Sequence, residues 1–329
     1  MTDQGKAGIK LEDDPIGPES ALVAERELRE TPERIRESCQ ELRALMKEHR
    51  LVFREDDDFL LTFLRPTKYY SHSALDLMRR IVEFRIKNAS VLHGLIPKDE
   101  EDGFLNNRVV NVLRDRDQHG RRIMVIQCGA DWNPRTVKTD QLFRMLYLIH
   151  LAAIQEPETQ VKGAIIIMDF HGMSMTQATH CMNLTFVARL LTFIQDAMPL
   201  RLKQVHIVKQ PFIFQIVWNV FKPFIREKLR NRLFFHGSKM SSLHKFIEPN
   251  YLPEDYGGSR PKIDYSSADW FPVLNEIEED IKGLKLDFLT YYHLHTKNIY
   301  FWITSSGWLN VSSLLLAIDF SRVLYIVNH

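Results

Sequence analysis

Cysteine is scarce in this sequence: only Cys39, Cys128 and Cys181 occur among 329 residues, in no CxxC arrangement. An odd, widely spaced set of thiols predicts neither a disulfide framework nor a zinc site. A charge excess of one sign is missing too, because the formal net charge is +1. That balance excludes a globally basic nucleic-acid binder. The first twenty residues lack the apolar run of a secretory signal, so a reducing, cytoplasmic setting is expected.

Common catalytic motifs are absent as well. The patterns HExxH, GxxxxGK[ST], GxGxxG and GxSxG do not occur, so zinc-protease, P-loop, dinucleotide-binding and serine-hydrolase sites lack their signatures. Asp169, His171 and Ser174 follow a predicted strand, where ligands of open α/β sheets often lie. Without a nucleophile elbow, this cluster favours capping and loop packing over a catalytic triad. We expect no enzymatic activity, no cofactor and no metal.

Charge is distributed unevenly along the chain. Residues 1–60 carry a net −6, whereas residues 201–245 carry a net +9 with Glu227 as the one acidic residue. In the basic stretch the cations alternate with Phe, Leu, Ile and Trp. This pattern suits an anionic membrane surface or a nucleic-acid backbone. A solvated helix face is the structural alternative.

Hydrophobic periodicity divides the chain into four parts. Residues 1–20 are polar and rich in Gly and Pro, which indicates a flexible leader. Residues 21–95 predict a small helical bundle, with one helix over 25–49 and another that Asp56, Asp57 or Asp58 caps. Residues 96–258 form the main domain. Residues 259–329 are a C-terminal extension of unclear structure.

The main domain alternates predicted strands and helices. Two strands flank the turn at 118–120, and a helix over 140–154 precedes a β-branched run at 161–169 of the buried parallel-strand kind. A helix at 184–194, a strand at 205–208, a helix from Phe212 and a strand at 233–237 follow. This order predicts an α/β domain built on a largely parallel sheet.

The C-terminal extension contains an uncharged stretch at 298–318, long enough to span a membrane. Ser305, Ser306, Asn310, Ser312 and Ser313 dilute its hydrophobicity, and Asp319 and Arg322 interrupt the apolar segment that follows. A packed or disordered appendage is the favoured interpretation over a membrane span.

The helix over 212–221 is apolar on nearly every side, so it must be buried, cover a cavity or contact a membrane. Pro223 predicts a break near Lys222, and the basic residues Arg226, Lys228, Arg230 and Arg232 come next. An apolar helix beside a basic cluster is typical of a membrane-docking lid. A core helix with a solvated continuation is the alternative.

Several spaced motifs resemble the CRAL-TRIO lipid-binding family, especially the branch of alpha-tocopherol transfer protein, cellular retinaldehyde-binding protein and the clavesins. They run in the family's order from DDDFLLTFLRPTKYY through LRDRDQHGRRIMVIQCGADWNP, ETQVKGAIIIMDFHGMS and PLRLKQVHIVKQP to LPEDYGG. The resemblance covers residues 56–258. It implies a three-layer α/β fold with a mostly parallel sheet, a preceding N-terminal helical bundle, a hydrophobic cavity and a mobile lid.

The resemblance also assigns residues by position. The lid residues that face ligand or membrane correspond to Phe214, Val217 and Val220, and the phosphoinositide-contacting cations to Arg201, Lys203, Lys228 and Arg232. The cavity lining is assigned to nine residues: Phe143, Leu146, Tyr147, His150, Met168, Leu190, Ile194, Leu200 and Leu202. Leu146 and His150 stand where the tocopherol protein has serines, which argues against tocopherol itself. His150 could bind a ligand hydroxyl or carbonyl, although a satisfied core histidine is the favoured interpretation.

The leading hypothesis is a monomeric, non-enzymatic carrier that binds a small hydrophobic ligand, such as a tocopherol, a retinoid or another lipid. It would exchange this ligand at phosphoinositide-bearing membranes and associate peripherally with endosomal or other intracellular membranes, with no nucleic-acid partner. A membrane-recruited, phosphoinositide-binding adaptor without a transported ligand is the alternative. A lipid hydrolase using Ser174 and His171 is the weakest hypothesis.

Overall fold

The computed structural model describes residues 10–279 and residue 281. It begins with four substantial helices: α1 (Pro18–Leu28), α2 (Pro32–Glu48), α3 (Asp57–Leu64) and α4 (Ser71–Lys87). The single helix predicted over 25–49 is wrong. Arg29 adopts a left-handed conformation (φ 67°), and Thr31 caps a new helix that has Pro32 in its first turn. The predicted cap of α3 is confirmed, because the Asp56 carboxylate accepts from the Phe59 amide at 3.0 Å.

The main domain follows the predicted alternation. Its strands are β1 (Val110–Val112), β2 (Arg122–Gln127), β3 (Ala164–Asp169), β4 (Leu202–Val208) and β5 (Leu233–Gly237). Its helices are α5 (Ala89–Leu92), η1 (Pro97–Glu100), α6 (Glu101–Leu105), α7 (Thr139–Ala153), α8 (Pro157–Lys162), α9 (Met175–Cys181), α10 (Leu184–Asp196), α11 (Phe214–Phe221), η2 (Lys222–Phe224), α12 (Glu227–Arg230), α13 (Met240–Leu243), η3 (Pro249–Tyr251), η4 (Glu254–Tyr256) and α14 (Ser267–Glu276). The break expected at Pro223 is confirmed, since α11 gives way to a 3-10 turn at Lys222.

The five strands form one sheet in the order β1-β2-β3-β4-β5. β1 runs antiparallel to β2, and the other neighbours are parallel, with Met124 opposite Ile166 and Ile166 opposite Val205. Helices between parallel strands cover the sheet, as crossover connections require. The predicted mixed fold with a mostly parallel sheet and a preceding helical bundle is confirmed.

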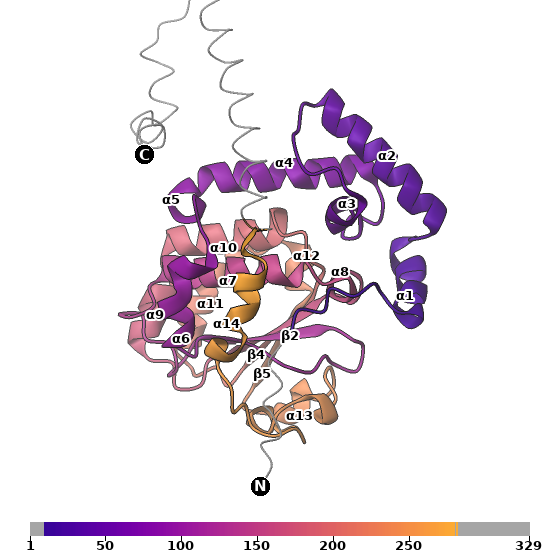
Figure 1. Ribbon diagram of the computed structural model, residues 1–329. Helices are drawn as coiled ribbons and strands as arrows, with labels where there is room; N and C mark the ends of the chain where they lie inside the picture. Colours follow the sequence, from indigo (N-terminus) through magenta and orange to yellow (C-terminus); the bar gives the residue numbers. More distant parts are fainter. Residues whose placement is uncertain (1–9, 280, 282–329) are drawn as a thin grey trace, which may run out of the picture.

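Alternation along the strands gives the sheet two apolar faces. Ile165 and Ile167 of β3 pack with residues of α13 and the following loop, including Leu243 and Leu252. Ile166 and Met168 face the opposite side, toward α7, α10 and α11. Figure 1 shows these helices on one side of the sheet and α13 on the other. The continuous apolar run at 164–168 therefore serves two separate layers.

The segment before α1 packs against the main domain. Leu11 contacts the largest hydrophobic cluster, and the Glu12 carboxylate lies 2.6 Å from Arg116 and 3.1 Å from Arg122. Residues 10–17 therefore do not form the flexible leader predicted over 1–20, and α1 already begins at Pro18. Gly and Pro favour irregular backbone in residues 10–17, but the ion pairs of Glu12 with Arg116 and Arg122 hold this segment against the main domain.

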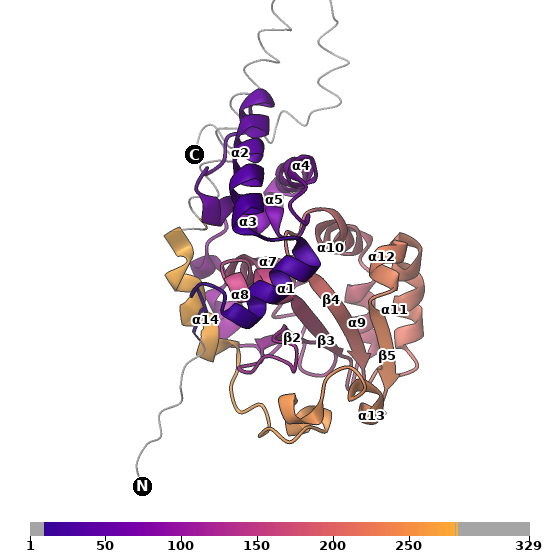
Figure 2. The ribbon, with the colours of Figure 1, turned by 90° about the vertical axis from the view of Figure 1, so that its right-hand side faces the viewer.

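A buried ion pair joins the N-terminal helices to the main domain. Arg65, which follows α3, donates to both oxygens of Glu30 at 3.0 and 2.8 Å and to Gln160 of α8 at 2.6 Å. Both charged side chains are only 7% exposed. Two charges removed from water are stable only when each satisfies the other. Figure 2 shows α1 and α3 beside α8, where these contacts form.

Arg65→Met should lower the free energy of unfolding by about 3–5 kcal/mol, because Glu30 would keep a buried charge without its partner. Chemical denaturation followed by circular dichroism measures this loss. Arg36→Met is the matched control, since Arg36 pairs with Glu33 at 3.6 Å on an exposed helix face and should cost less than about 1 kcal/mol. Equal losses in the two variants would contradict the structural role assigned to Arg65.

Candidate ligand cavity and basic surface

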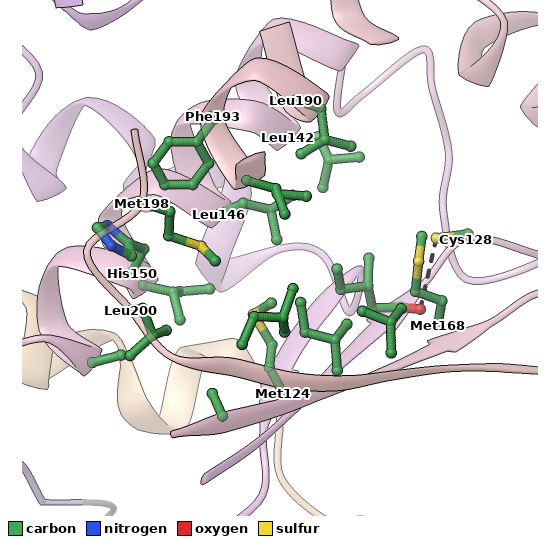
Figure 3. A pocket seen from close by; sticks show the side chains of 18 of the residues that line it. Met124, Cys128, Leu142, Leu146, His150, Met168, Leu190, Phe193, Met198 and Leu200 are labelled. Carbon is green, nitrogen blue, oxygen red and sulfur yellow. Dashed lines mark hydrogen bonds between the residues drawn. The ribbon is translucent and has the colours of Figure 1, made fainter. Parts of the chain in front are cut away.

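A cavity of about 220 Å³ lies between the sheet and its helical cover. Its floor is the apolar face of all five strands: Val112, Met124, Ile126, Ala164, Ile166, Met168, Leu202, Val205, Ile207 and Leu233. Its cover comes from α7, α10, α11 and α14, and the close-up in Figure 3 shows side chains converging from both layers. A largely apolar wall of this kind suits a hydrophobic ligand.

Most of the residues predicted to line the cavity do so. Leu146 and His150 of α7, Leu190 and Ile194 of α10, Met168 of β3, and Leu200 and Leu202 at the start of β4 all form part of its wall. Phe143 and Tyr147 are the corrections. They point into the neighbouring aromatic core, where Phe143 stacks on Tyr147 at 6.2 Å and meets Phe193 edge-on at 5.8 Å.

The C-terminal extension contributes to the site, which the sequence analysis missed. Trp270, Val273 and Leu274 of α14 line the cavity, and α14 packs against α6, α7 and β1. A local signal was present, because Ser266 and Asp269 form a capping box ahead of an apolar helix. The uncharged stretch at 298–318 lies outside the described residues.

His150 is buried in the cavity wall without a hydrogen-bond partner. Its side chain is 6% exposed, and neither ring nitrogen has a partner in the structure. Tyr147 and Phe193 contact the ring, Phe193 edge-on at 5.0 Å. Burial lowers the pKa of His150 from its ordinary 6.5 to about 3, so the imidazole is neutral at physiological pH. The favoured prediction of a satisfied core histidine is therefore wrong.

The cavity has one charged end. Arg122 and Glu156 line it there and pair with each other, with Arg122 Nε 3.1 Å from the carboxylate. Thr159 donates to the same carboxylate at 2.6 Å, and Arg116 does so at 3.0 Å. Leu11 and Lys10 line this end as well. The charges are thus mutually satisfied and the N-terminal segment covers them.

Three of the four predicted phosphoinositide-contacting cations come together. Arg201 and Lys203 lie 2.7 and 2.9 Å from one Glu27 oxygen, and Arg232 donates to the Leu202 carbonyl between them. Burial and the neighbouring Arg201 lower the pKa of Arg232, which reflects two cations held close together. Lys228 is exposed on α12 and makes no ion pair within the described residues. Below, Arg201, Lys203 and Arg232 are called the basic cluster.

Glu27 of α1 occupies the basic cluster. Burial raises the pKa of its carboxyl group, but hydrogen bonds from Lys203 and Arg201 outweigh this and lower the pKa to about 2. Gly163 allows the close approach of this region, because a Cβ there would lie 2.3 Å from the Arg201 carbonyl. The role of Glu27 was not predictable from the sequence, since no local pattern connects it with Arg201, 174 positions away.

The helix α11 divides its apolar residues between the protein and solvent. Phe214 and Val217 are buried and line the cavity, whereas Val220 packs partly buried in a neighbouring cluster. Phe212 is 94% exposed, and Ile216 is 45% exposed. One side of α11 therefore covers the cavity, as a lid or core helix would. The other side is an exposed apolar surface.

Asp169, His171 and Ser174 do not form a catalytic arrangement. The Asp169 carboxylate accepts from the His171 backbone amide and from Lys209 Nζ, each at 2.9 Å. Ser174 caps α9 in a capping box with Gln177. The capping and packing role predicted for this cluster is confirmed.

Within the described part of the chain, no helix is both long and apolar enough to cross a membrane.

His150→Leu should make the chain less sensitive to acid. Below about pH 6.5 the unfolded chain binds a proton at His150 that the folded chain excludes, so stability falls as pH falls. Each such histidine contributes about 1.4 kcal/mol per pH unit. Between about pH 6 and about pH 5, denaturant unfolding of the variant should show a smaller loss by that amount. The control His49→Leu, at an exposed position, should keep the wild-type slope, and a wild-type slope in His150→Leu would contradict the prediction.

Comparison with known proteins identifies the family. The sequence profile of the CRAL/TRIO domain matches residues 106–258. The Mus musculus protein named alpha-tocopherol transfer protein-like is 36% identical over 260 residues, which cover 78% of this chain and 74% of that relative. Clavesin-2 of Homo sapiens is 30% identical over 273 residues, covering 80% and 81%. The solved structure of Sfh5 is a remote likeness, with a TM-score of 0.39 and 14% identity over 82% of this chain and 99% of that one. The matching domain profile and the two curated relatives show that the chain belongs to the CRAL/TRIO family.

Proposed function

We propose that this protein is a carrier that encloses one small hydrophobic ligand and exchanges it at phosphoinositide-containing membranes. It would act as a monomer in the cytoplasm and associate peripherally with endosomal or other intracellular membranes. The observation that carries the proposal is the apolar cavity enclosed between the sheet and helices α7, α10, α11 and α14. The ligand would be tocopherol-, retinoid- or other lipid-like, and relatives named alpha-tocopherol transfer protein-like support a lipid of this kind.

The α11 region supports membrane contact. Phe212, Ile216 and Phe224 expose apolar side chains on α11 and next to it, with Lys222 between them on the surface. Exposed apolar residues beside cations suit the interface of an anionic membrane, where the apolar groups enter and the cations hold phosphates. Because Phe214 and Val217 of the same helix line the cavity, movement of α11 into the interface would open the ligand site.

The basic cluster supports phosphate recognition. A carboxylate is already bound there, so the geometry of Arg201 and Lys203 suits an oxyanion. A multivalent phosphate carries more charge than Glu27 and would compete with it. Lys228, which is exposed one turn before Arg232, would add a further contact. At about 1 kcal/mol per cation, the basic cluster and Lys228 together would contribute several kcal/mol to binding at an anionic membrane surface.

The second candidate is a membrane-recruited adaptor without a transported ligand. The exposed apolar residues on α11 and the basic cluster would serve either function equally. The cavity favours the carrier, because an adaptor has no need to leave part of its core open.

Native mass spectrometry of the purified chain should show a one-to-one hydrophobic adduct after incubation with tocopherol, retinol and phospholipid. Met168→Trp should reduce the adduct with the fold unchanged, since Met168 is a partly buried side chain in the cavity floor and the larger indole would occupy part of the cavity. Met175→Trp is the matched control, because Met175 is 57% exposed on α9. A wild-type chain that takes up none of these lipids would overturn the carrier in favour of the adaptor.

Glu27→Gln should strengthen binding to phosphatidylcholine vesicles that contain phosphatidylinositol bisphosphate. Removing the carboxylate frees Arg201 and Lys203, so apparent affinity should rise by roughly fivefold, equal to about 1 kcal/mol. Vesicle flotation over a range of lipid concentrations measures the change.

Glu25→Gln is the control for this comparison, because Glu25 lies on the same helix, loses the same charge and is exposed. Vesicles with phosphatidylserine at matched charge separate phosphoinositide recognition from general attraction to anionic lipid. Identical binding by Glu27→Gln and Glu25→Gln would show that the basic cluster is not the phosphate site.

A further inference from the structure

His150 is the one buried polar side chain of the described cavity wall whose hydrogen-bonding capacity is unmet. Trp132 donates to the Val137 carbonyl at 2.9 Å, and Trp270 donates to Asn111 at 3.0 Å. Arg122 and Glu156 satisfy each other at the charged end. Only His150 combines near-complete burial in the wall with two ring nitrogens that have no partner. Buried polar groups in folded proteins are almost always hydrogen-bonded, so an exception requires an explanation.

Among the described residues, none offers His150 a hydrogen-bond partner. Figure 3 shows the ring beside Met198 and near Phe193 and Leu200, whereas Cys128 and Met168 lie at the opposite end of the cavity. These neighbours are apolar or aromatic. With no partner among the described residues, the contents of the cavity are the source of a polar partner that we consider. A buried polar position in an otherwise apolar wall is how binding sites fix the orientation of a hydrophobic ligand.

We propose that His150 is the specificity-determining residue of the cavity and hydrogen-bonds an uncharged hydroxyl or carbonyl group at one end of the ligand. The hydrocarbon body of the ligand would extend from there toward Met168 and Cys128. This inference rests on the proposed carrier function and names the ligand class: a lipid alcohol, aldehyde or ketone with one polar end.

The chemistry of the ring favours an uncharged partner. A neutral imidazole has one N–H donor and one nitrogen acceptor, so it can bind a hydroxyl through either atom and a carbonyl through the donor. The two rings in contact with His150, those of Tyr147 and Phe193, carry no positive charge to stabilise an ionised carboxylate. Transfer of an ionised group into such apolar surroundings would be strongly unfavourable.

The same geometry discriminates against pure hydrocarbons. A hydrocarbon ligand would leave both His150 nitrogens buried without a partner, whereas an alcohol of the same shape would satisfy one of them. A site built to hydrogen-bond a polar group rejects the analogue that lacks it, because the polar group of the protein then stays unpaired.

The test uses farnesol and farnesene, which share a hydrocarbon skeleton but differ in the hydroxyl. Affinities for the full-length chain can be followed by tryptophan fluorescence, since Trp132, Trp218 and Trp270 line the cavity, and checked by calorimetry. The wild-type chain should bind farnesol roughly tenfold more tightly than farnesene, a ratio expected for one net hydrogen bond. His150→Leu should remove this preference by weakening farnesol while farnesene binds as well or better. His150→Gln, which keeps a donor and an acceptor, should retain part of it.

Leu190→Met is the control, because it changes the wall without changing its polarity and should affect both probes alike. Equal wild-type affinity for farnesol and farnesene would overturn the role of His150 but leave the carrier intact. A His150→Leu variant that keeps the wild-type ratio of farnesol to farnesene affinity would likewise overturn the role of His150 and leave the carrier intact. If His150→Leu fails to fold, the wild-type ratio and His150→Gln still decide the matter. Wild-type chain that binds neither probe would count against both the carrier and the anchor.

Discussion

Between its sheet and helical cover this chain encloses an apolar cavity of about 220 Å³, and that cavity constrains the rest of the fold. Side chains that line a cavity make fewer contacts with protein atoms than those of a close-packed core. At about 24 cal/mol per Å³, a cavity of this size corresponds to a deficit on the order of 5 kcal/mol. That is comparable to the net stability of a typical domain, so other parts of the structure must offset it.

Two features supply that stability away from the cavity. The sheet's other face packs densely, with Ile165, Ile167 and Leu252 fully buried. The N-terminal helices form their own hydrophobic cluster, joined to the main domain through Arg65, Glu30 and Gln160. Ligand binding would add to these, because a molecule that binds only the folded chain stabilises it by mass action. A carrier built this way couples its stability to its cargo.

Local sequence patterns predicted the elements whose signals are local. The β-branched run at 164–168, the break at Pro223 and the cap at Asp56 all follow from short-range physics, and the structure has each of them. Seven of the nine residues that the family resemblance assigns to a ligand cavity line the cavity of the structure. Phe143 and Tyr147 do not, because the exact rotation of α7 decides which of its buried residues face the cavity and which face Phe193.

Features that depend on distant contacts were not predictable in this way. Glu27 reaches Arg201 across the tertiary structure, and α14 closes the cavity from a segment that lies outside the family motifs. The unmet capacity of His150 is also a tertiary property, since it depends on what every neighbouring element fails to provide. Sequence could identify a buried histidine, but only the assembled wall distinguishes an unpartnered ring from a satisfied one.

The N-terminal segment connects the two sites that the proposed exchange requires. Leu11 lines the cavity, Glu12 pairs with Arg116 and Arg122, and Glu27 holds the basic cluster. A phosphate that displaces Glu27 would remove one of the contacts that dock α1, and in the described chain α1 follows directly on the segment that carries Leu11 and Glu12. Phosphate binding and closure of the cavity would then oppose each other, and by linkage a bound ligand that favours closure would weaken phosphate binding by the same factor. Under that coupling, a loaded carrier would bind the membrane less tightly than an unloaded one, because Glu27 both occupies the basic cluster and docks the helix that follows the cavity-covering segment.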